Sequence, residues 1–447
     1  MSWSFLDTDI VLVAGVSAMA SALIGTFLVL RGMSMMGDAI SHAVLPGIAL
    51  AFLITHSRDT GVIVVGAAIA GVATAAFTQL IHEVGNVDRG AAMGVVFTTL
   101  FAVGLILIVR SADSVHIDVH AVFYGAVELT PLNTITIAGV RLPRALLILA
   151  AVFAADLAFV LFLYKELNIT SFDPALATAL GFNARLMHYA LMIMVAVTIV
   201  AAFESVGSIL VIAMLIVPGA VASMFTRRLW SMLVLGQILA AAFAVSGHVG
   251  AITVPRWFGL SDTSTAGMMT VMAGVAVVVA LVVAPERGLV ARLIRRLQVG
   301  IAVGRQDILV ELLRSDDRGE PCRSRAALVG EEVSRIAGRS NRFDRSFALL
   351  TEVASGRVQR RSGGFGLSTA GREAATMLLR KHRLWESYLF EKGATARDEV
   401  HFAAHQLEHV TSDRLQRELT LEASETDPHG KPVPSVDPEA ESEAGAE

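Results

Sequence analysis

The chain has 447 residues, of which 54% are hydrophobic and only 17% are charged, and its formal net charge is −4. Soluble globular proteins carry about 25% charged residues, so this composition excludes a chain that is soluble throughout. The single cysteine, Cys322, excludes a disulfide framework and a cysteine-rich metal site. Residues 1–284 are mostly apolar, whereas residues 285–447 hold most of the Arg, Asp and Glu, which predicts a membrane domain followed by a polar domain.

The apolar half contains segments long enough to cross a membrane, which requires about 20 apolar residues in a helix. We count nine, and because some are short or contain glycine, eight is the alternative. Lipid leaves backbone groups unsatisfied unless they pair within a helix, so the predicted fold is an all-α polytopic bundle of eight or nine transmembrane helices over residues 1–297. The segments are approximately 10–30, 39–55, 60–82, 90–110, 145–164, 185–203, 207–223, 229–249 and 265–284.

Basic residues in short loops predict the orientation, because cytoplasmic loops are enriched in Arg and Lys. Arg227 and Arg228 lie between two segments, Lys165 and Arg185 flank another loop, and four arginines follow the last segment. These positions fall on one side of the membrane if the polar half is cytoplasmic. The N-terminus and residues 111–143 are then expected outside.

Asp38 and His42 interrupt the second apolar segment, in the sequence RGMSMMGDAISHAVLPGIAL. Their i, i+4 spacing places both on one face of a helix. A carboxylate with an imidazole suits Mn²⁺, Zn²⁺ or Fe²⁺, and an ionisable group inside a membrane usually marks a transport pathway. The alternative is a structural hydrogen-bonded pair between helices.

Other polar positions in the apolar half are weaker candidates. Glu204 lies in AAFESVGSIL, where it could equally sit in a surface loop, and His248 lies in SGHVGAITVP. The segment HIDVH contains His116, Asp118 and His120, and its alternative is an ordinary solvated loop.

Three stretches are distinctive: RGMSMMGDAISHAVLPGIALAFL, LNITSFDPALATALGFNARL and FESVGSILVIAMLIVPGAVASMFT. They resemble the integral-membrane permease of bacterial ABC transporters for manganese, zinc and iron(II), over roughly residues 10–297. The resemblance implies a second permease subunit, identical or different, an extracellular metal-binding lipoprotein and a separate cytoplasmic ATPase. It also implies that Asp38 and His42 lie on the metal path and Asp118 in an external gate, where His120 replaces an acid.

The loop over residues 166–184 contains Asp173, Pro174 and Gly181 between helical stretches. It is predicted to be cytoplasmic, and the resemblance implies that it forms a short coupling helix for the ATPase; the alternative is a plain connector. The chain has no GxxxxGK[ST] phosphate-binding loop. We therefore expect a transporter subunit that does not hydrolyse ATP by itself, rather than an enzyme.

The polar half is predicted to begin with a linker at residues 298–304 and a winged helix-turn-helix at 305–380. Helices are expected at 305–319, 327–339 and 342–354, and RVQRRSGGFGLS predicts a two-stranded wing. Ser368 or Thr369 can cap the helix that follows. Five arginines could form a basic, DNA-binding face, or simply a solvated surface: Arg342, Arg345, Arg357, Arg360 and Arg361.

Histidine and glutamate gather next, in residues 381–425. His401, His405, Glu408 and His409 fall at i, i+4, i+7 and i+8, on one helix face. Upstream, His382 and Glu386 form another i, i+4 pair. These residue types suit Mn²⁺, Fe²⁺ or Zn²⁺, and the alternative is a polar helix face on which the histidines occur by chance.

The motifs RKHRLWESYL, DEVHFAAHQLEHVTSDRL and DPHGKPVP resemble the diphtheria-toxin-repressor family of metal-dependent regulators, over about residues 305–434. The resemblance implies a metal-binding and dimerisation region, with a primary site at His405, Glu408 and His409. It implies an ancillary site at His382, Glu386 and His401. Asp307 and Glu311 are candidates for one further ligand. Residues 426–447 are expected to form an acidic disordered tail.

Two functions are compatible with these patterns. The first is the permease subunit of an ABC importer for Mn²⁺, Zn²⁺ or Fe²⁺ in a bacterial plasma membrane, with a cytoplasmic metal-sensing domain. The alternative is a membrane-tethered, metal-dependent transcriptional regulator that binds DNA. A tether needs only one or two spans, so eight or nine spans with an intramembrane acid and histidine favour transport.

Overall fold

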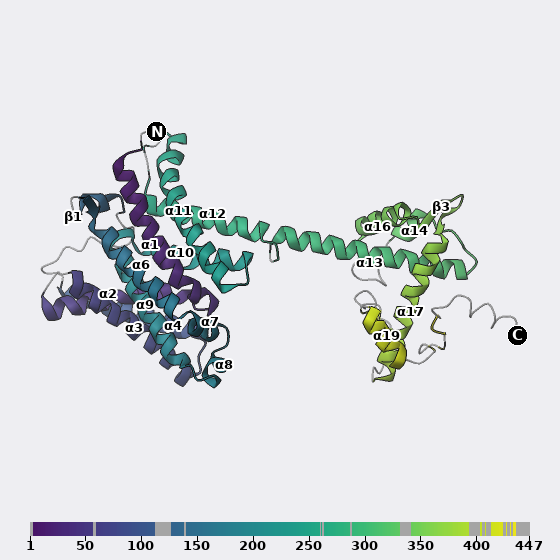
Figure 1. Cartoon of the computed structure of the whole chain (residues 1–447), viewed down its shortest axis with the longest axis horizontal. Helices are drawn as coiled ribbons and strands as arrows, with labels where there is room; N and C mark the ends of the chain where they lie inside the picture. Colours follow the sequence, from purple (N-terminus) through teal and green to yellow (C-terminus); the bar gives the residue numbers. More distant parts are fainter. Residues whose placement is uncertain are drawn as a thin grey trace. The chain divides into compact units, whose positions relative to one another are not determined.

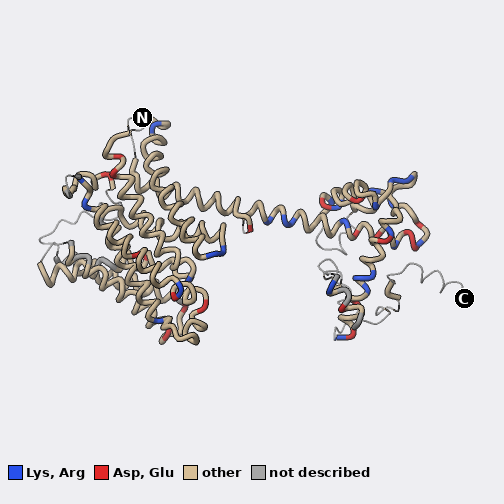
Figure 2. Tube along the Cα trace, in the orientation of Figure 1, with Lys and Arg blue, Asp and Glu red and all other residues tan. Residues whose placement is uncertain are grey.

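Two compact units, Met1–Ala291 and Arg292–Glu447, make up the chain (Figure 1). The computed structural model describes residues 3–56, 60–111, 127–137, 140–259, 261, 263–286, 288–330 and 341–392. Beyond these it describes the short stretches 403–404, 407, 413–422, 426, 430 and 432–434. Figure 2 shows that charged residues are sparse in the first unit and frequent in the second, as the sequence predicted.

The first unit is a bundle of helices (Figure 1). In the described residues, nine helices are long and apolar enough to cross a membrane, and they correspond to the nine segments predicted from the sequence. They are α1 (Phe5–Leu30), α2 (Met35–Thr55), α3 (Thr60–Gly85), α4 (Arg89–Ser111), α6 (Arg144–Phe162), α9 (Ala184–Val206), α10 (Ser208–Phe225), α11 (Leu229–Trp257) and α12 (Thr265–Val283).

Helix α1 forms the centre of this bundle. It packs against α6, α9, α10 and α11, and its side chains Ile24, Phe27 and Leu28 are fully buried. Ser4 caps its first turn, because the Ser4 hydroxyl accepts from the amide of Asp7 while Asp7 accepts from the amide of Ser4. The more peripheral helices α2, α3 and α4 pack mainly on one another and reach the centre through α9 and α10.

Helices α2 and α3 approach closely enough for backbone contact. A Cβ atom on Gly66 would lie only 2.7 Å from the carbonyl oxygen of Gly47, and a Cβ atom on Gly47 would be closer still to the carbonyl oxygen of Gly66. Only glycine allows this separation. The contact fixes α2, the helix of Asp38 and His42, against α3.

Short elements complete the first unit. The 3-10 helix η2 (Val127–Leu132) precedes a hairpin of β1 (Thr134–Ile137) and β2 (Val140–Pro143), in which Thr134 pairs with Pro143 and Ile137 with Val140. Between α6 and α9 lie α7 (Tyr164–Phe172) and α8 (Pro174–Ala179). A short helix in this loop is what the sequence predicted.

The second unit contains a winged-helix-like arrangement, as predicted. Strands β3 and β4 pair antiparallel, with Val358 opposite Leu367, and Ser368 caps the next helix by accepting from the amide of Gly371 at 3.0 Å. Ile308, Leu312 and other buried side chains form its core. The elements are α13 (Leu289–Asp317), α14 (Arg325–Val329), α16 (Arg342–Ala354), β3 (Val358–Arg361), β4 (Gly364–Leu367), α17 (Thr369–Glu391) and α19 (Asp413–Glu422).

Residues 298–304, expected to be a linker, are instead helical, because α13 runs through them. Val303 is buried and Ile301 packs against the core, while Gly300 lies against α16, where a Cβ atom would be 2.6 Å from Oδ2 of Asp344. These contacts explain why the segment is ordered as a helix. The expected helix at 327–339 corresponds to α14 only in part, since residues 331–340 lie outside the described residues.

Candidate metal sites and coupling segment

Asp38 and His42 lie on one face of α2. Nε2 of His42 is 3.4 Å from Oδ1 of Asp38, and the two side chains are 31% and 36% exposed. The pair is therefore neither buried in the packed interior nor fully exposed. A cation reaching this face would meet one carboxylate and one imidazole, both in a position to ligate.

Two aromatic rings of α4 hold the imidazole of His42 in place. The ring centroids of Phe97 and Phe101 lie 5.9 and 5.8 Å from that of His42, the second edge-on. In the residue before His42, the Ser41 hydroxyl donates to the carbonyl oxygen of Gly37, one turn earlier in the helix. The rings restrict the rotation of His42 and give the pair an apolar wall on one side.

His248 is part of a structural network rather than an open site. Its side chain is almost fully buried, with Nε2 3.3 Å from Oδ1 of Asp7 and Nδ1 3.0 Å from the Thr265 hydroxyl. The amide of Thr265 in turn donates to Glu128. Because these residues come from α1, α11, α12 and η2, the network joins four elements.

A buried acid in α6 was missed in the sequence. Asp156 is fully buried, and its Oδ2 accepts a hydrogen bond of 2.8 Å from the Thr198 hydroxyl of α9. The sequence did contain a signal for it, because Asp156 is the lone acid in a mostly apolar helix of 19 residues. The pair links α6 to α9.

Several predicted positions cannot be placed. His116, Asp118 and His120 lie outside the described residues. Glu204 lies in the last turn of α9, and its side chain is also outside what the structure describes. The predicted external gate therefore stays a prediction.

The predicted coupling residues define the ends of α8. Asp173 is its N-cap, since Oδ1 accepts from the amide of Leu176 at 2.9 Å, and Pro174 occupies the first helical position. Gly181, at a φ of 90°, reverses the chain after α8, and Asn183 caps α9 in the same way as Asp173 caps α8. Each residue thus has a local physical role that fixes this short helix.

His382 and Glu386 form the second acid–imidazole pair, on α17. Nε2 of His382 is 3.2 Å from Oε1 of Glu386, and the side chains are only 7% and 5% exposed. The other predicted ligands of this unit, His401, His405, Glu408 and His409, lie outside the described residues. Within the described residues, no group of three or more potential ligands gathers.

Arg345 does not belong to the predicted basic face. Its side chain is buried, and Nη2 lies 3.3 Å from Oδ2 of Asp307 on α13. The expectation that Arg345 faces solvent was wrong because the amphipathic helix α16 turns this arginine inward, where Asp307 compensates its charge. Glu311, the other candidate ligand in α13, lies 3.9 Å from Arg323.

The exposed face of α16 is apolar. Phe343, Phe347 and Leu350, spaced i, i+4 and i+7, are exposed, whereas Arg342 is the exposed arginine of this helix. Helices that read DNA present polar and basic side chains to the major groove. This composition is unlike such a surface.

The comparisons with known proteins decide the family. Residues 4–284, more than half of the chain, match the model of the ABC 3 transport family. The chain belongs to this family. Residues 368–435 match a second model, the iron dependent repressor, metal binding and dimerisation domain. Both resemblances seen in the sequence are thereby confirmed, and the family and spans indicate a multi-pass membrane protein.

Three transport-system membrane proteins resemble this chain over different extents. The manganese transport system membrane protein MntD of Bacillus subtilis (strain 168) is 44% identical over 62% of this chain and 92% of its own length. The zinc transport system membrane protein TroD of Treponema pallidum (strain Nichols) is 38% identical, over 64% of this chain and 76% of its own length. MntC, a manganese transport system membrane protein of the same B. subtilis strain, is 28% identical over 90% of this chain and 89% of its own, so that similarity includes both units.

One solved structure supports the fold of the first unit. It is PsaBC from Streptococcus pneumoniae in complex with Fab, with a TM-score of 0.52 and 29% identity. The match covers 64% of this chain and 94% of that chain.

Proposed function

We propose that this chain is the membrane-spanning permease of an ABC importer whose cargo is Mn²⁺, Zn²⁺ or Fe²⁺. The observation that carries the proposal is the Asp38–His42 pair, placed on a spanning helix of an ABC 3 family member. A divalent cation that leaves water needs compensating ligands in a low-dielectric bundle, and this pair supplies an anionic oxygen and a nitrogen.

The transport cycle proposed here is alternating access. The metal passes an outer segment that contains Asp118, rests near Asp38 and His42, and is released on the other side. A second permease subunit, the same or different, would complete the pathway, and an extracellular metal-binding lipoprotein would deliver the ion. The partial exposure of Asp38 and His42 supports this role, because a cargo site must be open to its ion.

A separate ATPase would drive the cycle through α8. Support comes from the cap at Asp173, which begins the short helix α8, and from the cap at Asn183, which begins the span α9 after it. Just before it, Thr170 and Ser171 accept hydrogen bonds of 3.0 and 3.1 Å from Arg31, which lies seven positions before Asp38. A displacement of α8 therefore has a direct route to the start of α2.

The C-terminal unit is proposed to be a cytoplasmic sensor of the same class of metal. His382 and Glu386 fit the role of ligands because both are nearly buried and face each other at 3.2 Å. His401, His405, Glu408 and His409 are proposed to complete the sites. A bound Mn²⁺, Fe²⁺ or Zn²⁺ would supply positive charge that stabilises one arrangement of this unit and slows import.

The alternative, a tethered repressor, is less well supported. The recognition-helix position is occupied by α16, whose exposed face carries Phe343, Phe347 and Leu350. The inward turn of Arg345 also removes one of the predicted DNA-contacting charges. Tight, metal-dependent binding of the full chain in detergent to a specific DNA duplex would favour the repressor.

Metal uptake by cells tests the main proposal. Cells with and without this chain, each expressing its ATPase and lipoprotein partners, are supplied with labelled Mn²⁺, Zn²⁺ and Fe²⁺. We expect uptake of at least one ion to depend on the chain. Equal uptake of all three ions in both strains would contradict the proposal.

A further inference from the structure

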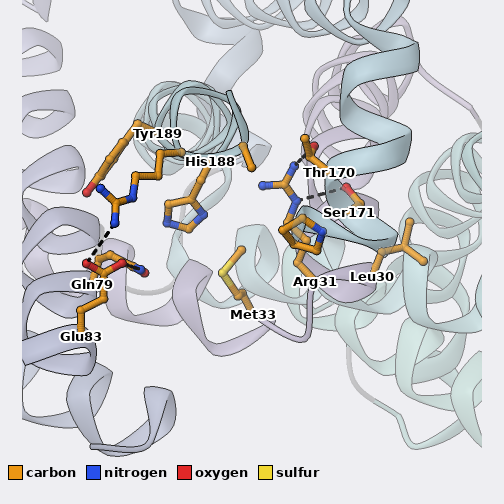
Figure 3. A pocket seen from close by; sticks show the side chains of 12 residues that line it. Leu30, Arg31, Met33, Gln79, Glu83, Thr170, Ser171, His188 and Tyr189 are labelled. Atoms are coloured by element: carbon orange, nitrogen blue, oxygen red, sulfur yellow. Dashed lines mark hydrogen bonds and ion pairs between the residues drawn. The ribbon is translucent and has the colours of Figure 1, made fainter. Parts of the chain in front are cut away.

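A cavity of about 460 Å³ lies beside the coupling segment, among α1, α3, α7 and α9. Figure 3 shows Gln79, Glu83 and Tyr189 on one side of it and Arg31, Thr170 and Ser171 on the other, with His188 and Met33 between them. No predicted metal residue lines this cavity. Its chemistry is therefore separate from the cargo path.

Among the described residues, the positive charge of Arg31 has no carboxylate partner. Its Nε donates to the Ser171 hydroxyl and its Nη2 to the Thr170 hydroxyl, and both acceptors are neutral. The part of the chain that the structure describes provides it no ion pair. Burial lowers the pKa of Arg31 to about 10, which still leaves the guanidinium charged near neutral pH.

The acid in the same cavity is already engaged. Oε1 of Glu83 accepts from Nε2 of Gln79 at 2.6 Å, and Oε2 lies 4.0 Å from Nη2 of Arg185. The charge of Arg185 therefore balances that of Glu83. Counting the Asp, Glu, Lys and Arg residues that line the cavity in the described structure, Arg31 leaves a net charge of one positive unit. Such a cavity favours an anion.

The cavity lies at a membrane boundary. Three spans end or begin there: α1 ends at Leu30, immediately before Arg31; α3 ends at Gly85, after Glu83; and α9 begins at Ala184, before Arg185. Lipid headgroups occupy this level. Basic pockets between transmembrane helices at the cytoplasmic boundary are typical binding sites for acidic headgroups.

We propose that this cavity binds the phosphate of an anionic membrane lipid. The guanidinium of Arg31 uses Nε and Nη2 for the two hydroxyls, and Nη1 is left to donate to a phosphate oxygen. Leu80 and Leu186, exposed neighbours of Gln79 and Arg185, offer apolar surface for the acyl chains. A bound phosphate would hold Arg31, and through Thr170 and Ser171 the segment that precedes α8.

Lipid retention by the full chain tests the proposal. The protein is reconstituted in an equal mixture of phosphatidylglycerol and phosphatidylcholine, and native mass spectrometry measures which lipid stays bound after detergent extraction. We expect wild type to prefer phosphatidylglycerol and Arg31→Gln to lose about fivefold of that preference. Arg228→Gln removes the same charge from an exposed position at another helix end and should behave as wild type.

A second variant separates binding from folding. Ser171→Glu leaves Arg31 in place but supplies the missing carboxylate, and it should lower the preference as Arg31→Gln does. Equal preference in wild type, Arg31→Gln and Ser171→Glu would overturn the proposal. Displacement of the lipid by millimolar inorganic phosphate would assign the site to a soluble phosphate instead.

The last measurement repeats the lipid-retention experiment with the ATPase subunit bound. Loss of the preference when the ATPase subunit is bound would assign the cavity to a carboxylate of that subunit and overturn the lipid assignment. Retention of the lipid in the complex would support it. Because this readout does not involve metal, its failure is distinguishable from a failure of the transport proposal.

Discussion

The two acid–imidazole pairs of this chain have the same spacing but different surroundings. Asp38 and His42 on α2 are about one third exposed, whereas His382 and Glu386 on α17 are nearly buried, although the N–O distances are 3.4 and 3.2 Å. An aromatic wall borders the first pair, and the second lies within the fold of the C-terminal unit.

This difference suits two different tasks. An ion that is cargo must enter and leave within each cycle, so its ligands need access to a pathway. An ion that acts as a signal should exchange slowly and change the stability of the structure around it, which is what burial favours. The four predictions that follow test this division, in order of expected effect.

The largest effect is expected at the exposed pair. Asp38→Ala and His42→Ala should each reduce metal uptake by about 100-fold or more, because loss of even an indirect metal contact costs 10–100-fold in affinity. Uptake of labelled Mn²⁺, Zn²⁺ and Fe²⁺ measures this, with the amount of membrane-inserted protein determined in parallel.

His56→Asn is the matched control for the histidine change, since His56 is exposed at the end of α2 in a left-handed conformation that Asn tolerates. If Asp38→Ala and His42→Ala both transport metal at the wild-type rate, the cargo site lies elsewhere, and Glu204 is the next candidate.

Transport by way of the exposed pair, Asp38 and His42, should also depend on an intact helix α8. Ala177 is fully buried, and its amide donates to the carbonyl oxygen of Asp173 at 3.0 Å. Ala177→Pro removes this bond and disfavours the helix by about 3 kcal/mol, roughly a 150-fold change in its population. We expect transport-coupled ATP hydrolysis by the complex to be lost, while Ala177→Ser, which keeps the amide, remains coupled. Normal coupling in the proline variant would point to another loop.

The buried pair should control inhibition by internal metal. We expect ATP hydrolysis of the purified complex to slow by 5–150-fold as Mn²⁺, Fe²⁺ or Zn²⁺ rises on the C-terminal side, which corresponds to about 1–3 kcal/mol of coupling. Glu386→Gln, and His405→Ala combined with His409→Ala, should relieve this. The measurement is the metal dependence of phosphate release.

Glu373→Gln, the same change at an exposed position of α17, should leave the inhibition intact. A truncation should end at Ala291, the boundary between the units and only the third residue of α13, because a cut at residue 304 would leave about half of that helix on the chain. Unchanged metal sensitivity in the truncated chain would exclude regulation by the C-terminal unit.

The smallest effect concerns the cap of α17. Ser368→Ala removes the hydroxyl that accepts from the amide of Gly371, which should destabilise the first turn by about 1 kcal/mol. Hydrogen exchange in that turn should rise about fivefold, whereas uptake should not change. Ser368→Thr should keep the cap, and equal exchange in all three proteins would show that the cap is dispensable.

The sequence was most informative where the interactions are local. Hydropathy located all nine spans, and i, i+4 spacing predicted that Asp38 faces His42 and that His382 faces Glu386. The short helix α8 was predictable because a capping residue, Asp173, and a proline, Pro174, mark its start.

The features that were missed depend on partners distant in the sequence. Arg31 contacts residues 139 and 140 positions away, and Asp156 bonds a residue 42 positions away, so local spacing identifies neither set of partners. Arg345 resembled a surface arginine because its partner, Asp307, lies on another helix. Residues 298–304 were expected to form a linker, whereas Gly300 in fact permits close packing of α13 on α16.

The backbone contact between Gly47 and Gly66 has a mechanical consequence. Two helices that touch through their main chains have no layer of side chains to rearrange, so α2 and α3 can neither slide nor separate easily. They should travel as one rigid body during transport. Distance labels placed on these two helices should then read constant values throughout the cycle, and the pair becomes a fixed reference frame for measuring the displacement of every other helix.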